Sequence, residues 1–458
     1  MKRKGPAARG RRFGLDLPAG LLTLTSRRKP APAGRQALPW PANGCLSVLD
    51  LGGAYIKAAV CRLQAGRVEI LGLGVAPVGD VSGSAAAVAE ACERALTQAE
   101  DMTAESAGQT IVADQALIGL PAVGVRLASH FVQYYRRSAS EAVSEEELGR
   151  VLYSAQRDAL RRLAAGGDGV PPASASGGEE VLLLTPCSAA QVLLDGHYAD
   201  DPAGLRGEVI GLRLVNVLAA SRAVAGAEEI ADLLKLDPPR LALPAQGVQA
   251  AWREALGSDG IGVDMGGRNT TLSLWRGGAL RGVMSVPAGG WDATCALGRA
   301  CRVTDARAER LKTEYAAGKF DAVQREWIQD VLRPMLERWV EAVARGLAEL
   351  AGGETLPAAV WLWGGGAELP DAAGALRGLS HGLGLSFDGF PMVRLLSPAE
   401  ATGVDNHSGV TLGGMGVNVL ALARAAAAPA APLQGLLTEA TLAAAEAEGI
   451  STWVPVDD

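Results

Sequence analysis

Two stretches far apart in the chain follow the same plan, and this repetition constrains the fold more than any other feature. Each starts with an apolar segment that ends in Asp, passes a glycine turn and continues through two more strand-like segments: "CLSVLDLGGAYIKAAVCRLQAGRVEILGLGVAPV" (45–78) and "GIGVDMGGRNTTLSLWRGGALRGVMSVPAGG" (260–290). Short apolar runs separated by glycine turns predict an antiparallel meander in each stretch. Two matching meanders indicate a duplication at the scale of a domain.

The presence of glycine in these turns has two explanations, and neither turn by itself decides between them. One explanation is that a hairpin needs glycine for positive φ, and the other is that glycine lets backbone N–H groups approach a phosphate closely. If the two turns face each other across a cleft, Asp50 and Asp264 at the strand ends are suited to hold a hydrated Mg²⁺. The two turns together therefore predict a phosphate clamp.

Two further segments are candidates for the rest of a nucleotide site. A strand followed by three glycines occurs in "AAVWLWGGGAELP" (358–370), where a flat base can lie close to bare backbone. Glu309 and Lys312 are three residues apart on one face of an expected helix, within reach of a ribose or base. In this order along the chain, the pieces favour nucleotide binding.

Length, hydropathy and cysteine usage argue against a membrane-spanning protein, a secreted protein and a protein that binds a metal through Cys or His. The 458 residues, 48% of them hydrophobic and 20% charged, predict two to four globular domains. The sequence has no apolar run long enough for a transmembrane helix and no signal-peptide pattern. Six scattered cysteines without a C-x-x-C pair, and four histidines, lack metal-ligand spacing and suggest reduced cytoplasmic thiols.

The charge distribution singles out the N-terminal segment. Residues 1–36 hold ten Lys or Arg and one Asp, and because the total charge is −7, the rest of the chain carries about −16. A basic arm on an acidic body suggests an anionic partner, although a solvated tail is an equal alternative. Within "RGRRFGLDLPAGLLTLTSRRK" the apolar side chains suited to enter a membrane surface are Phe13, Leu15, Leu17, Leu21, Leu22 and Leu24.

Helices are expected between and after the meanders. "SAAAVAEACERALTQAED" (84–101) and "SEEELGRVLYSAQRDALRRLAAG" (144–166) are amphipathic, and Ser144 with Glu147 predicts a capping box. Thr304 is a candidate N-cap of the helix that carries Glu309. A long amphipathic helix follows within 321–353.

These motifs resemble the actin/Hsp70/sugar-kinase ATPase superfamily, and within it the bacterial cell-division family FtsA. "VLDLGGAYIKAAV" is similar to the first phosphate motif, "VDMGGRNTTLSLWRGGAL" with "VPAGG" to the second, "DARAERLKTEYA" to the A-E-x-x-K nucleotide helix and "LWGGGAELP" to the adenosine motif. "SEEELGRVLYSAQ" and "LLDGHYADDPAGLRGEVIGLRLVNV" are similar to the FtsA segment of subdomain 1C. The resemblance extends from about residue 46 to residue 425.

The resemblance implies an α/β, actin-like ATPase fold: two duplicated RNase H-like domains flank a nucleotide cleft, with an FtsA-type 1C and a reduced 2B. It implies ATP and Mg²⁺ as cofactors, with Asp50 and Asp264 on the metal through water. The implied nucleotide-binding residues are Asp50, Gly52, Gly53, Lys57, Asp264, Gly266, Gly267, Arg268, Asn269, Thr270, Glu309, Lys312, Gly364, Gly365 and Gly366.

The chain departs from the family pattern at the positions closest to the expected chemistry. Arg268 replaces the third glycine of the second motif, Thr271 replaces its last Asp, and Leu243 stands where the family has an acid near the attacking water. Asn269 and Gly53 also stand where other residues are usual. The resemblance therefore implies ATP binding with at most slow hydrolysis, and no catalytic residue is assigned.

The resemblance also implies a division into subdomains. The expected parts are a basic tail and linker at 1–44; 1A at 45–119 and 226–257; 1C at 120–225; 2A at 258–303 and 357–411; a reduced 2B at 304–356; a final helix of 1A at 412–426; and an acidic C-terminal tail at 427–458. Family members typically end in a basic amphipathic helix, which this acidic end lacks.

Three functions fit these features. The first is an FtsA-like scaffold or membrane tether in bacterial division, cytoplasmic or peripheral at the inner membrane face, with an FtsZ-like tubulin homologue, divisome proteins and further copies of itself as partners. The second is a PilM-like scaffold of a type IV pilus or secretion machine. The third, a small-molecule kinase, lacks a substrate-binding insert. No nucleic-acid partner is expected.

Overall fold

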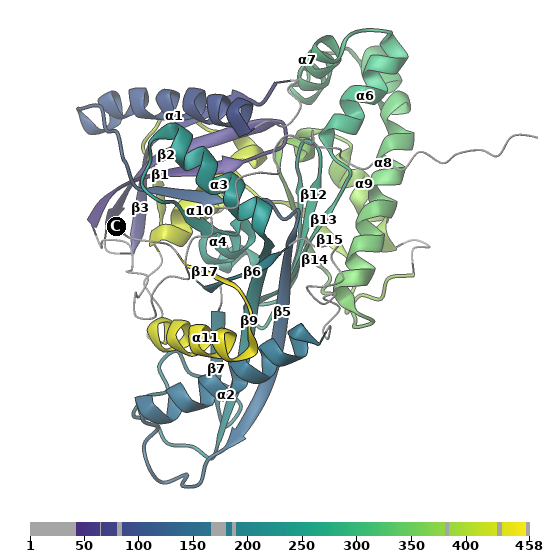
Figure 1. Ribbon diagram of the computed structural model, residues 1–458. Coiled ribbons are helices and arrows are strands. Elements are labelled where there is room, and N and C mark those ends of the chain that lie inside the picture. The colour runs from purple at the N-terminus through teal and green to yellow at the C-terminus, as the bar shows by residue number, and fades with distance from the viewer. Residues whose placement is uncertain are drawn as a thin grey trace, which may run out of the picture. The chain divides into compact units, whose positions relative to one another are not determined.

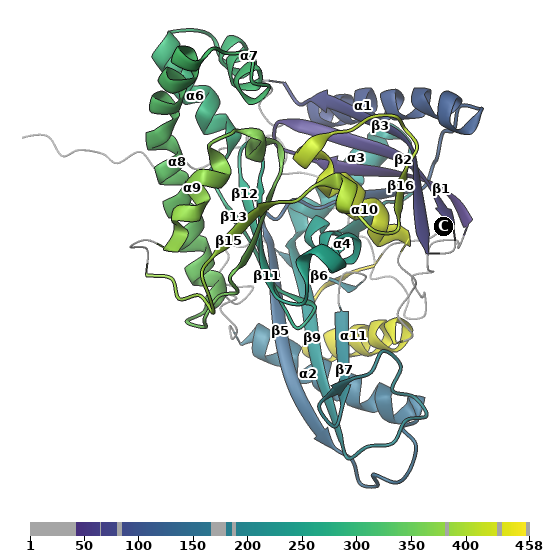
Figure 2. The same cartoon turned by 180° about the vertical axis from the view of Figure 1, so that it is seen from behind.

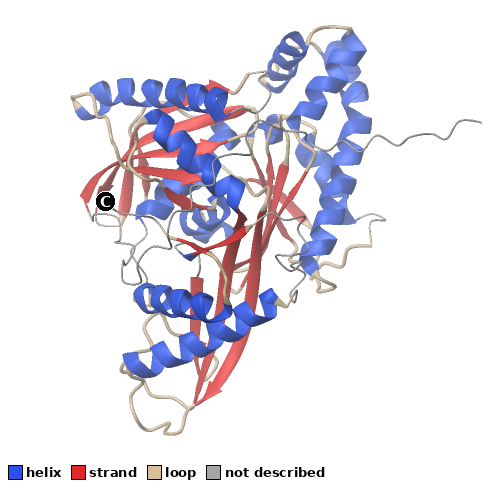
Figure 3. Cartoon of the chain, viewed as in Figure 1, coloured by secondary structure: helices blue, strands red, loops and turns tan. Residues whose placement is uncertain are grey.

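The computed structural model describes residues 43–64, 66–79, 85–165, 180–185, 189–380, 384–427 and 433–454. By internal contacts the chain divides into residues 1–36 and 37–458, and every described element belongs to the second unit. Its strands form three sheets with helices packed against them (Figure 3). The basic arm predicted at the N-terminus lies outside the described residues.

The first meander forms the centre of a mixed sheet with the strand order β10-β4-β1-β2-β3-β16. Strands β1 and β2 pair antiparallel, as do β2 and β3, whereas β4 lies parallel to β1. The bounds are Asn43–Leu51 for β1, Tyr55–Gln64 for β2, Arg67–Pro77 for β3, Ala116–Gly119 for β4, Arg240–Ala242 for β10 and Val404–Asn406 for β16.

Alternating side chains of this sheet enter two different cores, as the two-residue period of a strand requires. Leu49, Ala58 and Val60 pack with helices α1 (Ala85–Ala107) and α3 (Ser221–Leu234). Val48, Ala59 and Cys61 pack on the other side with α4 (Pro244–Ala251), α5 (Arg253–Leu256) and α10 (Val417–Ala427). Because both faces are covered, most residues of β1 and β2 are buried, and the buried ones are apolar except Ser47, Asp50 and Lys57.

The second meander occupies the same place in a second sheet, with the order β15-β14-β11-β12-β13. Its strands are β11 (Gly260–Met265), β12 (Thr270–Arg276), β13 (Ala279–Val286), β14 (Ala359–Trp363) and β15 (Met392–Leu395). Strand β14 lies parallel to β11, just as β4 lies parallel to β1. The order matches β10-β4-β1-β2-β3 strand for strand, which confirms the duplication predicted from the repeated meander.

Four helices share one core with the second sheet: α6 (Gly290–Cys301), α7 (Asp305–Ala316), α8 (Ala322–Ala351) and α9 (Ala372–Leu376). Helix α7 packs on α6 and lies beyond the end of the sheet, at the top of Figure 1. Helix α8 begins at the N-cap Asp321, whose carboxylate accepts the amide of Gln324 at 2.9 Å. Its side chains, from Ile328 to Leu347, share one core with strands β11, β12 and β14. Most of α8 therefore belongs to the layer of the second sheet, and segment 304–356, expected as a reduced 2B, has no separate core.

A third sheet has the order β17-β6-β9-β7-β8, with β5 also paired to β9. The strands are β5 (Val125–Tyr135), β6 (Val181–Leu184), β7 (Ala189–Leu194), β8 (His197–Tyr198), β9 (Val209–Ala220) and β17 (Thr452–Trp453). Helices α2 (Glu145–Ala164) and α11 (Gln434–Glu448) pack side by side against it (Figure 2). This sheet contains most of the segment predicted as subdomain 1C.

The expected acidic tail at 427–458 is wrong for residues 433–454. Gln156 of α2 donates to Thr441 Oγ1 of α11 at 2.7 Å inside the core, and Arg157 donates to Glu448 at 2.8 Å. Strand β17 pairs parallel with β6. The acidic Glu448 of this segment is thus bound to Arg157 and Arg161 of α2, and the segment completes the third sheet.

Two smaller expectations also need correction. Ser144 caps α2 by accepting the Glu147 amide, but the Glu147 carboxylate does not close the capping box, because it accepts Arg136 Nη2 at 2.8 Å and Nε at 3.0 Å. Strand β16 pairs with β3, so residues 404–406 belong to the first sheet although 357–411 was expected in 2A. The other subdomain boundaries stay a prediction.

Candidate functional site

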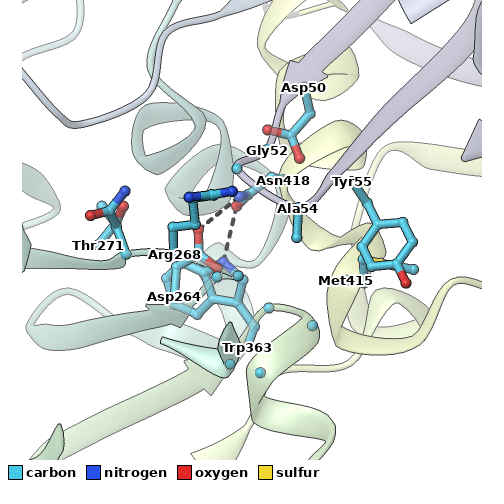
Figure 4. Close-up of a pocket in the computed structure, with 18 of the residues that line it drawn as sticks. Asp50, Gly52, Ala54, Tyr55, Asp264, Arg268, Thr271, Trp363, Met415 and Asn418 are labelled. Atoms are coloured by element: carbon cyan, nitrogen blue, oxygen red, sulfur yellow. Dashed lines mark hydrogen bonds between the residues drawn. The ribbon is translucent and has the colours of Figure 1, made fainter. Parts of the chain in front are cut away.

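Both glycine turns of the duplicated meanders open into one cavity of about 590 Å³, a volume in the range of small-molecule sites. The cavity is also lined by Gly364–Gly366 after β14 and by Glu309 and Lys312 of α7. Figure 4 shows Asp50, Asp264 and Arg268 converging on this space from the two meanders. The structure therefore brings together every predicted nucleotide-binding residue except Thr270.

The first turn carries a buried ion pair. Asp50 lies opposite Lys57 in the β1–β2 ladder, and Lys57 Nζ donates to Asp50 Oδ2 at 2.8 Å. Both side chains are almost fully buried, 7% and 10% exposed. Because each charge compensates the other, the strand end can keep an ionised carboxylate inside the protein.

The second turn carries a carboxylate, Asp264, that forms no ion pair with a described residue. Asp264 Oδ2 accepts Asn418 Nδ2 at 2.8 Å, and Asn418 Oδ1 accepts the indole N–H of Trp363 at 3.0 Å. Burial raises the pKa of Asp264 to about 6; the Asn418 hydrogen bond lowers it, the Asp50 charge raises it and Lys57 lowers it. This carboxylate favours a positive charge arriving from the cavity.

At two positions, Gly364 and Gly267, neighbouring atoms lie so close to the backbone that only glycine fits. Gly364 has φ +95°, and a Cβ there would lie 2.4 Å from Asp264 Oδ1. At Gly267 a Cβ would lie 2.4 Å from the Cβ of Ala54, so the tips of the two meander turns touch. Only a residue without a side chain fits at these positions. Because the turns can therefore approach each other closely, all three glycine turns border the same cavity.

Helix α7 presents its polar pair toward this space. Lys312 Nζ lies 2.8 Å from Glu309 Oε2 and donates to the carbonyl oxygen of Gly290 at 3.2 Å. Thr294 of α6 donates to Glu309 Oε2 as well. Burial and the Glu309 charge raise the pKa of Tyr55, which reaches the cavity from β2. Both residues of the pair are therefore fixed in place beside the turn of the first meander.

Thr270 does not face the cavity, contrary to the prediction. Its hydroxyl donates to Ala288 O at 2.7 Å and accepts the indole N–H of Trp339 at 2.9 Å under α8. Successive residues of a strand point to opposite faces, and Thr271 is the one that lines the cavity. The resemblance to the family motif thus identified the strand that lines the cavity, but it assigned the cavity-lining position to Thr270 instead of Thr271.

Arg268 brings a positive charge to the tip of the second turn. Its guanidinium lies 5.5 Å from the centre of the Trp291 ring, and its side chain passes within 3.4 Å of the position that a Cβ of Gly53 would take. The cation–π contact orients the guanidinium without neutralising it. Arg268 therefore remains available to an anion between the two turns.

Several residues of the cavity were not foreseen. Asn418, Trp363 and Glu368 line it, and Glu368 Oε1 accepts the Gly414 amide at 2.6 Å. The hydroxyls of Ser273 and Ser285 are buried there without a hydrogen-bond partner among the described residues. No short motif marks these positions, because they come from three strands of the second sheet, the turn after β14 and the helix α10.

The donor set fits a nucleotide better than it fits a metal bound by the protein alone. Bare glycine backbone, Arg268 and Lys57 suit phosphates, and the Glu309–Lys312 pair suits ribose hydroxyls or a base edge. The described part of the chain has no cluster of three or more His, Cys, Asp or Glu side chains that could hold a metal ion. A Mg²⁺ near Asp50 and Asp264 would take its other ligands from phosphate oxygens and water.

Among the described residues, no helix is both long enough and apolar enough to cross a membrane. The apolar residues predicted to enter a membrane surface, between Phe13 and Leu24, lie outside the described part.

Comparison with known proteins gives distant relatives. The chain is 27% identical over 295 residues to cell division protein FtsA of Rhizobium meliloti, an alignment that covers 61% of this chain and 62% of that protein. It is 24% identical over 286 residues to cell division protein FtsA of Agrobacterium fabrum, covering 59% and 60%. The chain thus spans about three-fifths of the length of the curated relatives it matches. No protein-family model matches it.

The solved structure of a PilM-PilN type IV pilus biogenesis complex has a chain with the same fold. It superposes with a TM-score of 0.55 at 20% identity, covering 84% of this chain and 99% of that one. An actin-type ATPase fold accounts for the two duplicated sheets and the cavity between their turns.

Proposed function

We propose that this chain, a divergent FtsA-like protein with the actin-type ATPase fold, is a nucleotide-binding scaffold that works in bacterial cell division. The observation that carries the proposal is the convergence of both meander turns, the Gly364–Gly366 turn and the Glu309–Lys312 pair on one cavity. In the proposed complex Arg268 and Lys57 face the phosphates. Glu309 and Lys312 face the ribose or base.

The partners in this proposal follow from the FtsA relatives. They are an FtsZ-like tubulin homologue, other divisome proteins and further copies of the same chain. The proposed location is the cytoplasm, with a peripheral position at the inner membrane face of the division site. Because the alignments cover only part of the relatives, each partner needs a direct test.

A thermal-unfolding assay with ATP and Mg²⁺ tests nucleotide binding. ATP at a hundredfold excess over Kd should stabilise the parent by about 2.7 kcal/mol, and Asp264→Ala should lose the Mg²⁺-dependent part of this protection. Asp330→Asn, at an exposed position of α8, is the control and should be protected like the parent. Equal protection of Asp264→Ala and the parent would place the nucleotide elsewhere.

The same proposal includes weak or absent hydrolysis. Leu243 lines the cavity at the position of the family's acid and is 2% exposed, and Thr271 lines it at the position of the last Asp. Neither side chain can take a proton from water at neutral pH. A steady-state turnover near 1 per second or above, the range of ordinary enzymes, would contradict this part.

PilM-like scaffolding of a type IV pilus is the second candidate, and the superposition over 99% of the solved PilM-PilN chain favours it. Pull-down with two kinds of bait peptide separates the candidates: the C-terminal peptide of an FtsZ and peptides of a PilN, each with and without ATP. Capture by the FtsZ peptide alone supports the division role, and capture by the PilN peptides alone supports the pilus role. Phosphate transfer to a small-molecule acceptor would instead point to a kinase.

A further inference from the structure

The second and third sheets meet along a seam that holds three arginines. Strand β5 lies against β13, and Gln191 Nε2 of β7 donates to Gly277 O in the β12–β13 turn at 3.2 Å. Figures 1 and 2 show β5 and β9 running beside β12 and β13. Arg213 of β9 enters the seam from the third sheet, and Arg276 and Arg281 enter it from the second. None of the three lines the nucleotide cavity.

Carboxylates compensate these charges only in part. Arg276 Nη1 lies 3.8 Å from Asp259 Oδ2, and Arg276 Nε lies 3.9 Å from Glu354 Oε2, both beyond hydrogen-bond length. A main-chain oxygen, that of Thr355, accepts Arg276 Nη2. Thus the carboxylates of the seam gather around one of its three guanidinium groups.

The other two arginines have neutral partners or none. Arg213 Nη1 donates to Tyr198 Oη at 3.1 Å and to Gln191 Oε1 at 3.3 Å, and its guanidinium lies 5.5 Å from the centre of the Phe131 ring. The side chain of Arg281 makes no hydrogen bond or ion pair with any part of the chain that the structure describes. Two positive charges of the seam therefore lack a negative counterpart in contact with them.

Each guanidinium group also has one buried N–H donor that makes no hydrogen bond to a described residue. Arg213 Nε, Arg276 Nε and Arg281 Nη1 are out of contact with solvent and have no hydrogen-bond partner among the described residues. Burial lowers the pKa of Arg281, and the charges of Arg213 and Arg276 lower it further. Glu354 and Tyr198 oppose this shift by raising the pKa. A buried charged donor without a hydrogen-bond acceptor raises the free energy of the folded protein.

We propose that the seam is an anion-binding site in which Arg213 and Arg281 together hold one oxyanion, with Arg276 and the Tyr198 hydroxyl beside it. A guanidinium fork matches the paired oxygens of phosphate and carboxylate groups. The ligand class is therefore an oxyanion, supplied by a free phosphate compound or by carboxylates of an acidic polypeptide. Because the two arginines belong to different sheets, the bound anion links the third sheet to the second. The site is independent of the proposed nucleotide cavity.

Calorimetric titration of the full chain at constant ionic strength tests the site, with inorganic phosphate in one arm and a hexaglutamate peptide in the other. We expect saturable binding of at least one probe, with Kd at least tenfold higher in both Arg281→Gln and Arg213→Gln. Phosphate can also enter the nucleotide cavity, so Arg268→Gln marks that cavity: a loss of binding in this variant alone would place the phosphate there and not in the seam. Arg345→Gln, at a 73% exposed arginine of α8, is the surface control.

The outcomes separate the sources and can overturn the proposal. Saturation by phosphate alone assigns a free phosphate compound, saturation by hexaglutamate alone assigns an acidic polypeptide, and saturation by both assigns the tighter binder. No saturable binding by either probe, unchanged Kd in Arg281→Gln and Arg213→Gln, or a loss only in Arg268→Gln would overturn the site.

Thermal unfolding in chloride buffer without either probe gives a second measurement. Arg281→Gln removes one of the like charges and no hydrogen bond to a described residue, so we expect it to unfold at no lower temperature than the parent. Arg213→Gln also loses its contacts with Tyr198, Gln191 and Phe131, so it is tested by titration alone. If Arg281→Gln unfolds at lower temperature while Arg345→Gln does not, Arg281 already has its full complement of contacts, and the proposal is wrong. The two variants lie on different sheets, so failure of one to fold leaves the other informative.

Discussion

At the scale of single residues, Thr270 and Thr271 show how one position along a strand decides a role. Thr270→Val leaves the Trp339 indole N–H without its acceptor inside the core, so we expect a loss of about 1–3 kcal/mol in the free energy of unfolding. Thr271→Val removes a hydroxyl that lines the cavity, so its effect on stability should be smaller. Denaturant unfolding of both variants compares them, and a larger loss for Thr271→Val would contradict the placement of the two side chains.

The raised pKa of Asp264 predicts that the free energy of unfolding depends on pH. Its pKa is raised from 3.8 to about 6 in the folded chain, so the folded state binds more protons than the unfolded state between these values. Stability therefore falls as pH rises through this window, and above it the carboxylate costs up to about 3 kcal/mol. We expect Asp264→Asn to be more stable than the parent at pH 7 and similar to it near pH 4.

Urea unfolding between pH 4 and pH 7 without nucleotide measures this difference. Asp330→Asn changes an exposed carboxylate and should keep the pH dependence of the parent. If Asp264→Asn and the parent differ by the same amount at both ends of the range, the carboxylate of Asp264 is not the group that titrates.

At the scale of elements, the duplicated meanders were predictable and helix α11 was not. A strand with both faces buried is a run of apolar residues, which stands out between glycine turns. Helix α11 buries mainly small residues, among them Ala440, Ala444 and Ala445, and these give little contrast with an alanine-rich tail. Its acidic Glu448 suggested a solvated end, although it pairs with Arg157 and Arg161 of α2.

The packing of α11 predicts that the C-terminal segment is needed for the third sheet. Leu437 is 1% exposed in the core with α2 and β9, so Leu437→Ala should lower the free energy of unfolding by about 2–5 kcal/mol. Glu446→Ala on the exposed face of the same helix is the control and should have little effect. Deleting residues 433–458 should expose this core, seen as increased binding of a hydrophobic dye; no increase would contradict it.

At the scale of the whole molecule, the sequence predicted which pieces meet but not how they are held. The motifs placed Asp50, Asp264, Gly364 and the Glu309–Lys312 pair in one cavity because each lies at the end of a strand or on a helix of recognisable pattern. The Asn418 hydrogen bond to Asp264 spans 154 residues, and the seam between the second and third sheets joins strands that no local pattern relates. Contacts of this range are decided by tertiary packing, which periodicity does not record.

The last prediction concerns attachment of the whole protein to a membrane. Residues 9–29 combine Arg and Lys with six large apolar side chains. Each basic residue near an anionic surface contributes about 1 kcal/mol, and burial of apolar area adds about 25 cal/mol per Å². We expect the full chain to sediment with anionic vesicles at low salt, and deletion of residues 1–30 to release it. High salt should weaken binding of the full chain, because it screens the attraction to lipid headgroups. Vesicles of neutral lipid are the control and should bind neither form. If the truncated chain sediments as well as the full chain, attachment does not depend on this arm.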